Sequence, residues 1–330
     1  MRSLSNSPAH RDAQGGGDPV VYRTVAHGEV DDALRLILAT DGKRASDEQV
    51  LDFLSFAMHR GIDLNQIRVA EEAGRLVWAV LPVLSPGRTM LLLSPPRVSR
   101  RLSDAAAPLL VEKVVGHFAS RGIDLAQVLI DPRDESAINL YQSCAFERLA
   151  ELIYLHRAVR ASERPLLPAG LHWKHYTPQT HERFGRAITA SYAGSLDCPA
   201  LNGRRGIEDV IAGHKAAGEF DPRLWHLLCA EGEADPLGVL LLSRSARSDA
   251  LELVYLGITP AARGQGLGEL MVQQALAVAG ASGCGLLSLA VDARNTPALK
   301  LYYRNGMSRV CTRMALLRDL RDAPVARATA

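Results

Sequence analysis

The chain contains one loop whose residue types suit the binding of a phosphate group. Residues 258–268 read Ile-Thr-Pro-Ala-Ala-Arg-Gly-Gln-Gly-Leu-Gly and follow an apolar segment, Leu251 to Ile258, typical of a buried strand. Glycines let a backbone turn its amide N–H groups inward. A helix is predicted from about Leu267, and its unpaired amides and positive dipole end attract an anion. The predicted pyrophosphate cradle consists of Arg263, Gly264, Gln265, Gly266, Leu267 and Gly268.

Two other glycine-loop motifs do not fit this loop. A dinucleotide fingerprint needs Gly-x-Gly-x-x-Gly, but its third glycine falls on Glu269 when counted from Gly264 and on Met271 when counted from Gly266. The nucleoside-triphosphate motif Gly-x4-Gly-Lys-Ser/Thr does not occur. A glycine turn that merely starts a helix stays an alternative interpretation of the loop taken alone.

A second segment makes the interpretation more specific. It reads Asn-Thr-Pro-Ala-Leu-Lys-Leu-Tyr from Asn295 to Tyr302 and is followed by Gly306 and Met307. The two segments, in this order, resemble the coenzyme loop and the later strand-to-helix segment of the GNAT acetyltransferase superfamily, where Phe is usual at the position of Met307. The resemblance implies acetyl-CoA as the cosubstrate and no metal.

The resemblance also assigns residues to the coenzyme. In the family, a kinked fourth strand leaves backbone N–H groups free for the pantetheine arm and the thioester oxygen, which here implies Leu256, Gly257 and Ile258. Glycine within a strand fits close approach of a ligand. At the start of the later helix, Asn295 is the expected partner of the pantetheine amides, with Ala298 also at the coenzyme.

Attack of an amine on a thioester requires a neutral nucleophile, a donor to the oxyanion and a proton for the thiolate. The resemblance places Tyr302 as the general acid, and a core tyrosine is the alternative. We expect Glu252 to be the general base, because it is the only charged residue between Leu251 and Ile258 and alternation puts it on the side of Leu256 and Ile258. A solvated strand end, or a base formed by water alone, is the alternative.

The acceptor site is the least specific part of the sequence. In the family, the first two helices and their connection line the acceptor cleft, which here brings Tyr192 to Pro199 and Asn202 to Arg205 into range. The candidate substrate residues are Tyr192, Asp197, which could pair with an amine, and Arg204 or Arg205, which could pair with an acid. An ordinary surface loop is the alternative.

An internal repeat divides the chain. The segment Asp131 to Tyr141 lies 161 positions before Asp292 to Tyr302, and Asp, Arg, Ala, Leu and Tyr match without a gap. Repetition at this spacing indicates duplicated domains. We expect an α/β (strictly α+β) protein of two tandem GNAT-like domains, each a mixed, mostly antiparallel sheet flanked by helices. The predicted divisions are a polar tail at 1–19, a first domain at 20–160, a linker at 161–170, a catalytic domain at 171–320 and a tail at 321–330.

The first copy lacks the glycines of the second. Ser99 to Asp104 align with Arg263 to Gly268 and contain no glycine, so the first domain is predicted to bind the coenzyme weakly or not at all. Arg97, Arg100 and Arg101 keep open the alternative that guanidinium groups hold a phosphate there. A single intact coenzyme loop, in the C-terminal copy, is a tandem arrangement that resembles the mycothiol synthase family.

Hydrophobic patterns predict the elements that position these residues. In the first copy they indicate strands at 20–23, 67–70, 76–83, 90–94 and 127–130 and helices at 31–39, 48–59 and 104–121. In the second copy they indicate strands at 171–176, 225–231, 238–243, 251–258 and 286–291 and helices at 181–192, 207–217, 268–279 and 296–303.

Composition sets limits on other classes of function. The 330 residues carry a formal net charge of +2 without a dense Lys/Arg block, which argues against nucleic acid as a partner. No apolar run reaches the length of a membrane span, and the first nineteen residues lack the apolar centre of a signal peptide, so a cytoplasmic protein is expected. The five cysteines form no Cys-x-x-Cys pair, which predicts no zinc site.

Three classes of function remain at this level. The leading hypothesis is an N-acetyltransferase that uses acetyl-CoA and a small-molecule amine, as a monomer or homodimer. A protein lysine or N-terminal acetyltransferase is the second, and a non-catalytic acyl-CoA sensor is the third, because the binding residues are better defined than the catalytic ones.

Overall fold

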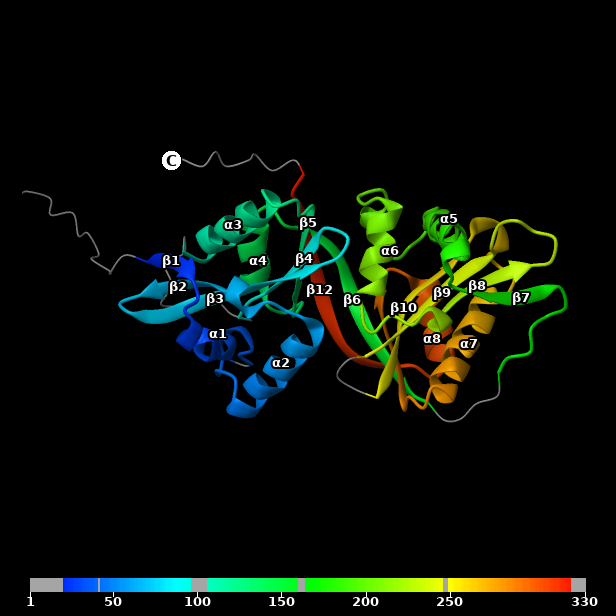
Figure 1. Cartoon of the computed structure of the whole chain (residues 1–330), viewed down its shortest axis with the longest axis horizontal. Helices are drawn as coiled ribbons and strands as arrows, with labels where there is room; N and C mark the ends of the chain where they lie inside the picture. Colours follow the sequence, from blue (N-terminus) through cyan, green and yellow to red (C-terminus); the bar gives the residue numbers. More distant parts are fainter. Residues whose placement is uncertain (1–19, 41, 96–105, 160–163, 246–248, 322–330) are drawn as a thin grey trace, which may run out of the picture.

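The computed structural model describes residues 20–40, 42–95, 106–159, 164–245 and 249–321. Within these ranges the chain forms one twelve-stranded sheet with helices on both faces (Figure 1). The strands are β1 (Val21–Thr24), β2 (Arg68–Glu72), β3 (Arg75–Ser85), β4 (Thr89–Leu93), β5 (Leu125–Ile130), β6 (Glu147–Ala158), β7 (Leu171–His175), β8 (Trp225–Ala230), β9 (Gly238–Arg244), β10 (Ala250–Ile258), β11 (Leu286–Asp292) and β12 (Ser308–Asp319). The α-helices are α1 (Val30–Ile37), α2 (Asp47–Arg60), α3 (Ala106–Ala119), α4 (Glu135–Ser143), α5 (His181–Tyr192), α6 (Ile207–Lys215), α7 (Leu267–Ala281) and α8 (Thr296–Arg304).

The sheet confirms the expected mixed, mostly antiparallel architecture. Its order is β1-β2-β3-β4-β5-β12-β6-β11-β10-β9-β8-β7, and only β4–β5 and β10–β11 are parallel pairs. The parallel ladders join Thr89–Leu91 to Leu125–Gln127 and Ala250–Glu252 to Leu286–Ser288. The second ladder repeats the first at the 161-residue spacing, so the sequence repeat is also a repeat of strand pairing.

The last strand of each half crosses into the other half. Strand β6 ends the N-terminal repeat but pairs with β11, and β12 ends the C-terminal repeat but pairs with β5. The two strands also pair with each other in the middle of the sheet (Figure 1). Each half therefore completes its sheet with a strand from the other half, an exchange that the hydrophobic patterns did not predict.

Local sequence explains where the helices begin. Helix α2 starts with a capping box, in which Ser46 Oγ accepts from the Gln49 amide, and ends at Gly61, whose φ of +62° suits glycine. The equivalent helices α4 and α8 share one N-cap: Asp134 accepts from the Ala137 amide at 3.1 Å, and Asn295 accepts from the Ala298 amide at 3.3 Å. The repeated Asp/Asn-x-x-Ala pattern is therefore a helix start in both halves.

Each half packs helices against both faces of its part of the sheet. In the N-terminal half, α1 and α2 cover one buried cluster and α3 and α4 the other. In the C-terminal half, α5 and α6 pack with β8 and β9, whereas α7 and α8 pack on the opposite face. Helix α7, which follows the glycine loop, and helices α5 and α6 thus approach strand β10 from opposite sides.

Candidate active site

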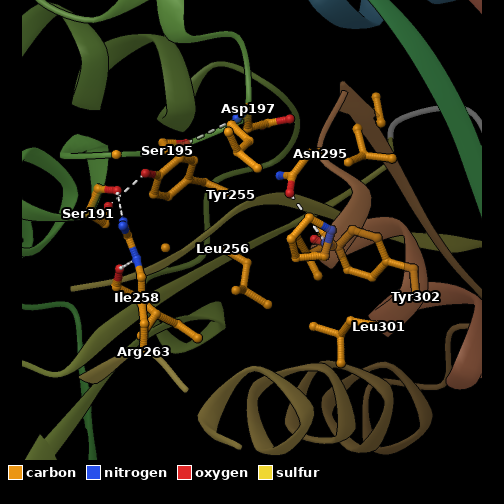
Figure 2. A pocket seen from close by; sticks show the side chains of 18 of the residues that line it. Ser191, Ser195, Asp197, Tyr255, Leu256, Ile258, Arg263, Asn295, Leu301 and Tyr302 are labelled. Atoms are coloured by element: carbon orange, nitrogen blue, oxygen red, sulfur yellow. Dashed lines mark hydrogen bonds between the residues drawn. The ribbon is translucent and has the colours of Figure 1, made fainter. Parts of the chain in front are cut away.

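A break in the pairing of β10 opens the central cavity of the C-terminal half. The β10–β11 ladder stops at Glu252, and the register of β10 against β9 shifts between Leu253 and Tyr255, as at a β-bulge. Past this point β10 and β11 separate around a cavity of about 290 Å³ (Figure 2). The lining includes Ser191, Gly194, Ser195, Leu196, Asp197, Leu253, Val254, Tyr255, Leu256, Gly257, Ile258, Arg263, Ala290, Val291, Asn295, Pro297, Ala298, Leu301 and Tyr302.

The same bulge corrects the predicted alternation of side chains. Leu251 and Leu253 pack toward α7, while Val254 and Tyr255 both pack toward α5 and α6. Leu256 and Ile258 then return to the α7 side. Glu252 alternates with Leu251 and Leu253, so it does not share a face with Leu256 and Ile258 as the sequence predicted, because the extra residue reverses the pattern.

The glycine loop between β10 and α7 presents a row of free amides. Gly264 and Gly266 have φ of +76° and +77°, conformations that favour glycine. Within the described part of the chain, the backbone N–H groups of residues 264–268 donate no hydrogen bond. Five consecutive unpaired amides at the N-terminus of a fifteen-residue helix can donate hydrogen bonds to a phosphate group.

Two side chains of the loop bind protein groups instead of facing the loop's amides. Arg263 donates to the carbonyl oxygen of Ser191 at 2.8 Å (Figure 2). It also donates to the carbonyl oxygen of Ala193, the C-cap residue of α5, at 2.7 Å. Gln265 donates to the carbonyl oxygen of Ala261 at 3.0 Å. These contacts fix the shape of the loop and tie it to α5. The Arg263 amide itself donates to the Pro260 carbonyl oxygen at 3.3 Å, so the free amides that can contact a phosphate begin at Gly264.

Gly257 lies where no larger residue fits. A Cβ atom there would lie 2.4 Å from Ser191 Oγ and 2.8 Å from the Tyr255 ring. Ser191 and Tyr255 are joined by a hydroxyl–hydroxyl hydrogen bond of 2.7 Å. Burial raises the pKa of Tyr255, which keeps the phenol neutral. The sequence did not single out this pair, because a lone Ser in a helix and a Tyr in a strand have no signature spacing.

Tyr302 is a buried phenol at the cavity. It lies on α8 and is 7% exposed, and its hydroxyl makes no hydrogen bond to any described residue. Burial raises the pKa of Tyr302, and the nearby charge of Asp197 adds to the rise. Tyr302 therefore holds its proton at neutral pH and can donate it to a bound group. Tyr303 is 46% exposed and faces away.

Asp197, Asn295 and Asp292 form a polar connection next to Tyr302. The Asp292 amide donates to Asp197 at 2.9 Å, and the Cys198 amide donates to Asp292 at 3.1 Å. Although Asp197 is exposed on one side, burial of its carboxyl raises its pKa, and the amide of Asp292 opposes the rise. Asp197 thus reaches the side of the cavity where Asn295 and Tyr302 lie, next to the residues that the sequence assigned to the coenzyme.

Glu252 lies outside the cavity lining, next to the N-terminal half. Burial raises the pKa of its carboxyl, and the positive charge of Arg60 in α2 opposes the rise. Burial raises the pKa of the Tyr154 phenol, on the exchanged strand β6, and the charge of Glu252 adds to the rise. Any proton transfer between Glu252 and the cavity therefore needs an intervening water.

The two candidate arginines of the acceptor loop differ in their surroundings. Arg204 donates to the Ala200 carbonyl oxygen at 2.8 Å. Its guanidinium also lies 3.6 Å from the Asp319 carboxylate of β12, so its positive charge is already paired with a carboxylate. Arg205 is half-buried beside α6, and burial lowers its pKa, with the nearby groups Tyr192 and Asp209 opposing the change. Tyr192 packs edge-on against Tyr255, with ring centroids 6.0 Å apart. Tyr192 and Arg205 thus lie behind Tyr255, toward α6.

The N-terminal half keeps a cleft at the equivalent position but not its free hydroxyl. A cavity of about 320 Å³ opens where β4 and β5 separate. Tyr141, the counterpart of Tyr302, donates to Ser94 Oγ at 2.8 Å. Arg313 from β12 lines this cleft. The predicted loss of a glycine loop concerns Ser99 to Asp104, which lie outside the described residues, as do Arg97, Arg100 and Arg101.

Two searches of the described residues bear on other classes of site. In the ranges given above, no group of three or more His, Cys, Asp or Glu side chains is arranged to hold a metal ion. Over the same ranges, no helix has the length and apolar character that a membrane crossing requires.

Comparison with known proteins identifies the fold of this site. Residues 196–307 match the profile of the Acetyltransferase (GNAT) family. The matched residues run from the loop after α5 to the residue before β12, and they include the glycine loop and Tyr302. A GCN5-related N-acetyltransferase from Sphaerobacter thermophilus is similar to the whole chain, with a TM-score of 0.63 and 17% identity over 92% of this chain and 97% of that one. A tandem GNAT protein from the clavulanic acid biosynthesis pathway has a TM-score of 0.52 and 13% identity over 93% and 100%. The chain thus has the fold of solved tandem GNAT proteins, as the repeat predicted.

The curated relatives that the chain resembles share one name. A mycothiol acetyltransferase of Jonesia denitrificans is 37% identical over 27% of this chain and 29% of that protein. Another, of Rhodococcus erythropolis, is 29% identical over 56% and 63%, and one of Beutenbergia cavernae is 27% identical over 83% and 89%. In the first two alignments the chain spans less than two thirds of the relative's length.

Proposed function

We propose that the chain is an acetyl-CoA-dependent N-acetyltransferase that acetylates the primary amine of a small molecule. The observation that carries the proposal is the combination of five free amides at the start of α7 with the separated strands β10 and β11 and the unbonded hydroxyl of Tyr302. The amides suit a pyrophosphate, and the gap between the strands admits an extended thioester arm. The curated relatives named mycothiol acetyltransferase support an amine acceptor.

The geometry supports direct transfer. The amine nitrogen attacks the thioester carbonyl carbon, so a C–N bond forms while the C–S bond breaks. A free amide of β10 beyond the bulge, at Leu256, Gly257 or Ile258, stabilises the oxyanion. Tyr302 gives its proton to the departing thiolate sulfur, and Glu252 receives a proton from the amine through a water. Asn295 and Ala298 hold the pantetheine side.

The two halves divide the work in this proposal. The C-terminal half, about residues 171–320, holds the coenzyme, and the N-terminal half, about residues 20–160, supports it. A comparison of the two equivalent tyrosines favours this division. The Tyr141 hydroxyl donates a hydrogen bond to Ser94, whereas the Tyr302 hydroxyl makes no hydrogen bond to the described residues. Tyr192, Asp197 and Arg205 are the proposed acceptor-side residues.

The test is an acceptor panel. The protein is mixed with acetyl-CoA and each of a set of amino sugars, polyamines, amino acids and lysine peptides, and free thiol is followed over time. We expect thiol release that depends on a small-molecule amine. Release only with peptides would favour a protein acetyltransferase, and coenzyme binding without release from any acceptor would favour a sensor.

Replacing Glu252 by glutamine is expected to lower kcat/KM for the acceptor roughly 100-fold. In the wild type, kcat/KM should rise with pH through an inflection above the usual carboxyl range, because burial raises the Glu252 pKa. The Glu252→Gln variant should lose that inflection. Glu233→Gln, on an exposed turn, is the matched control.

Stability should change in the opposite direction to activity. The raised pKa means that the folded protein binds the Glu252 proton more tightly than the unfolded chain does. The stabilisation that comes from this proton is complete at pH values below the pKa of the unfolded chain, and it is lost as the pH rises through the pKa of the folded protein. At neutral pH, the Glu252→Gln variant should therefore unfold at the same temperature as the wild type or higher. An unchanged pH profile would remove Glu252 as the base.

A further inference from the structure

Helix α6 lies between the cavity and the N-terminal half. Its residues Val210 and Ile211 belong to the buried cluster against which Val254 and Tyr255, at the bulge of β10, also pack. The His214 ring lies 5.4 Å from the Tyr255 ring. A displacement of α6 would therefore reach the cavity wall through Tyr255.

The turn between β3 and β4 rests directly on the start of α6. Gly87 has a φ of +82°, and a Cβ atom there would lie 2.1 Å from the carbonyl oxygen of Asp209. The carbonyl oxygen of Pro86 lies 3.6 Å from the Cβ position of Gly213, one helical turn further on. Backbone thus meets backbone, and any side chain at Gly87 must push the turn away from the helix.

Arg88 joins the same turn to both halves of the protein. Its guanidinium lies 2.8 Å from Asp124, before β5, and 3.3 Å from Asp209, in the first turn of α6. The Arg88 carbonyl oxygen also accepts from the Asp124 amide at 2.8 Å. One side chain of the N-terminal half therefore holds the N-terminal end of α6.

A second arginine holds the other end of α6. Arg60, the last residue of α2, donates to the carbonyl oxygen of Ala216, the C-cap residue of α6. The charge of Arg60 is also felt by Glu252. Both ends of α6 are thus fixed by groups of the N-terminal half, and the second contact lies close to the proposed base.

We propose that the N-terminal half is a positioning clamp for the acceptor side of the reaction. Arg60, Gly87 and Arg88 are its positioning residues, and they act through α6 on Tyr255. The proposal rests on the proposed function, because it concerns the acceptor of that reaction. The glycine loop at 264–268 is tied to α5 by Arg263, and the three clamp residues do not contact it. Loss of the clamp should therefore affect the use of the acceptor and not the binding of the coenzyme.

Arg88→Ala is expected to weaken the clamp without unfolding the protein. The variant should cost some stability, because Asp124 is 12% exposed and loses a charged partner, but the Arg88 side chain is itself 56% exposed and exposed ion pairs contribute little. The position of α6 matters more for rate, because misplacement by about 1 Å at a reacting centre can cost roughly 100-fold.

The experiment compares Arg60→Ala, Arg88→Ala and Gly87→Ala with the wild type in steady-state kinetics. We expect the acceptor KM to rise and kcat/KM for the acceptor to fall by about 10-fold to 100-fold, with the dissociation constant of acetyl-CoA unchanged. Arg88→Lys and Arg60→Lys should restore part of the loss. Arg44→Ala controls for a surface arginine of the same half, and Gly74→Ala controls for glycine strain, since Gly74 has φ +72° and open space around it.

Amide hydrogen exchange gives a readout that needs no turnover. In the three variants, exchange should quicken in α6 and not in α7, while the two controls match the wild type. Unchanged exchange in α6, or an acceptor KM equal to that of the wild type, overturns the clamp. A wild type that releases no thiol with any acceptor overturns the proposed function instead, and the exchange data still decide on the clamp.

Discussion

Replacing Gly266 by leucine is expected to abolish binding of acetyl-CoA while the protein stays folded. No atom lies within 4 Å of the Cβ position of Gly266, so the side chain causes no internal clash. It would instead occupy the space before the free amides of residues 264–268. Losing even two hydrogen bonds to a charged phosphate, each worth about 1.5–3 kcal/mol, means a dissociation constant raised more than about 100-fold. Titration calorimetry with acetyl-CoA measures the change.

Gly283 supplies a matched control for this substitution. It follows α7, has a φ of +74° and also has no atom within 4 Å of its Cβ position. Gly283→Leu should therefore carry the same backbone strain, about 1–2 kcal/mol, and leave coenzyme binding intact. Equal binding by the Gly266→Leu and Gly283→Leu variants would show that the pyrophosphate lies elsewhere.

Replacing Tyr302 by phenylalanine is expected to lower kcat by roughly 100-fold, the contribution usual for a positioned general acid. The hydroxyl makes no hydrogen bond to the described residues, so its loss should not disturb packing. Coenzyme affinity should stay close to that of the wild type, because the phenyl ring remains in place. Single-turnover measurement of thiol release, with calorimetry for binding, separates the two quantities.

The internal repeat offers the control. Tyr141→Phe removes the equivalent hydroxyl of the N-terminal half together with its 2.8 Å hydrogen bond to Ser94. This variant should lose a little stability, about 1 kcal/mol, and no activity. If Tyr302→Phe kept full kcat, Tyr302 would be a core residue and the thiolate would take its proton from water.

Much of the fold follows from local sequence. The predicted helix at 181–192 coincides with α5, and the predicted strand at 251–258 begins one residue after β10 does. These elements have strong periodicity and clear caps. The patterns did not predict β6 or β12, which carry charged residues near both ends, including two arginines in β6 and three in β12. Such a composition resembles a surface segment, although both strands are paired on each side.

The exchange of β6 and β12 is not encoded locally at all. Each strand would meet similar partners in its own half, because the two halves repeat the same pairing. Only the order of the whole sheet decides between the two arrangements. Sequence periodicity reports which residues are buried but not which of two equivalent neighbours buries them.

The candidate site shows the same limit. The glycine loop was predicted from its glycines and the helix after them, and Asn295 from the resemblance of its segment to the GNAT family. The structure adds that Gly264 and Gly266 have positive φ and that Asn295 caps α8. The side-chain direction of Arg263 depends on the end of α5, about seventy residues earlier in the chain. The face of Glu252 relative to Leu256 depends on the bulge between Leu253 and Tyr255. Neither feature is evident from the hydrophobic pattern.

The order of the sheet has a consequence for shortened chains. Among the strands of the described residues, only β1 and β7 lie at the edges of the sheet, so few strands offer unpaired backbone to other molecules. A product that stops before Ser308 would lack β12 and would expose the facing sides of both β5 and β6. Loss of the twelve residues of β12 would thus create two open edges in the middle of the molecule, one of them in the first half of the chain, and both would favour aggregation.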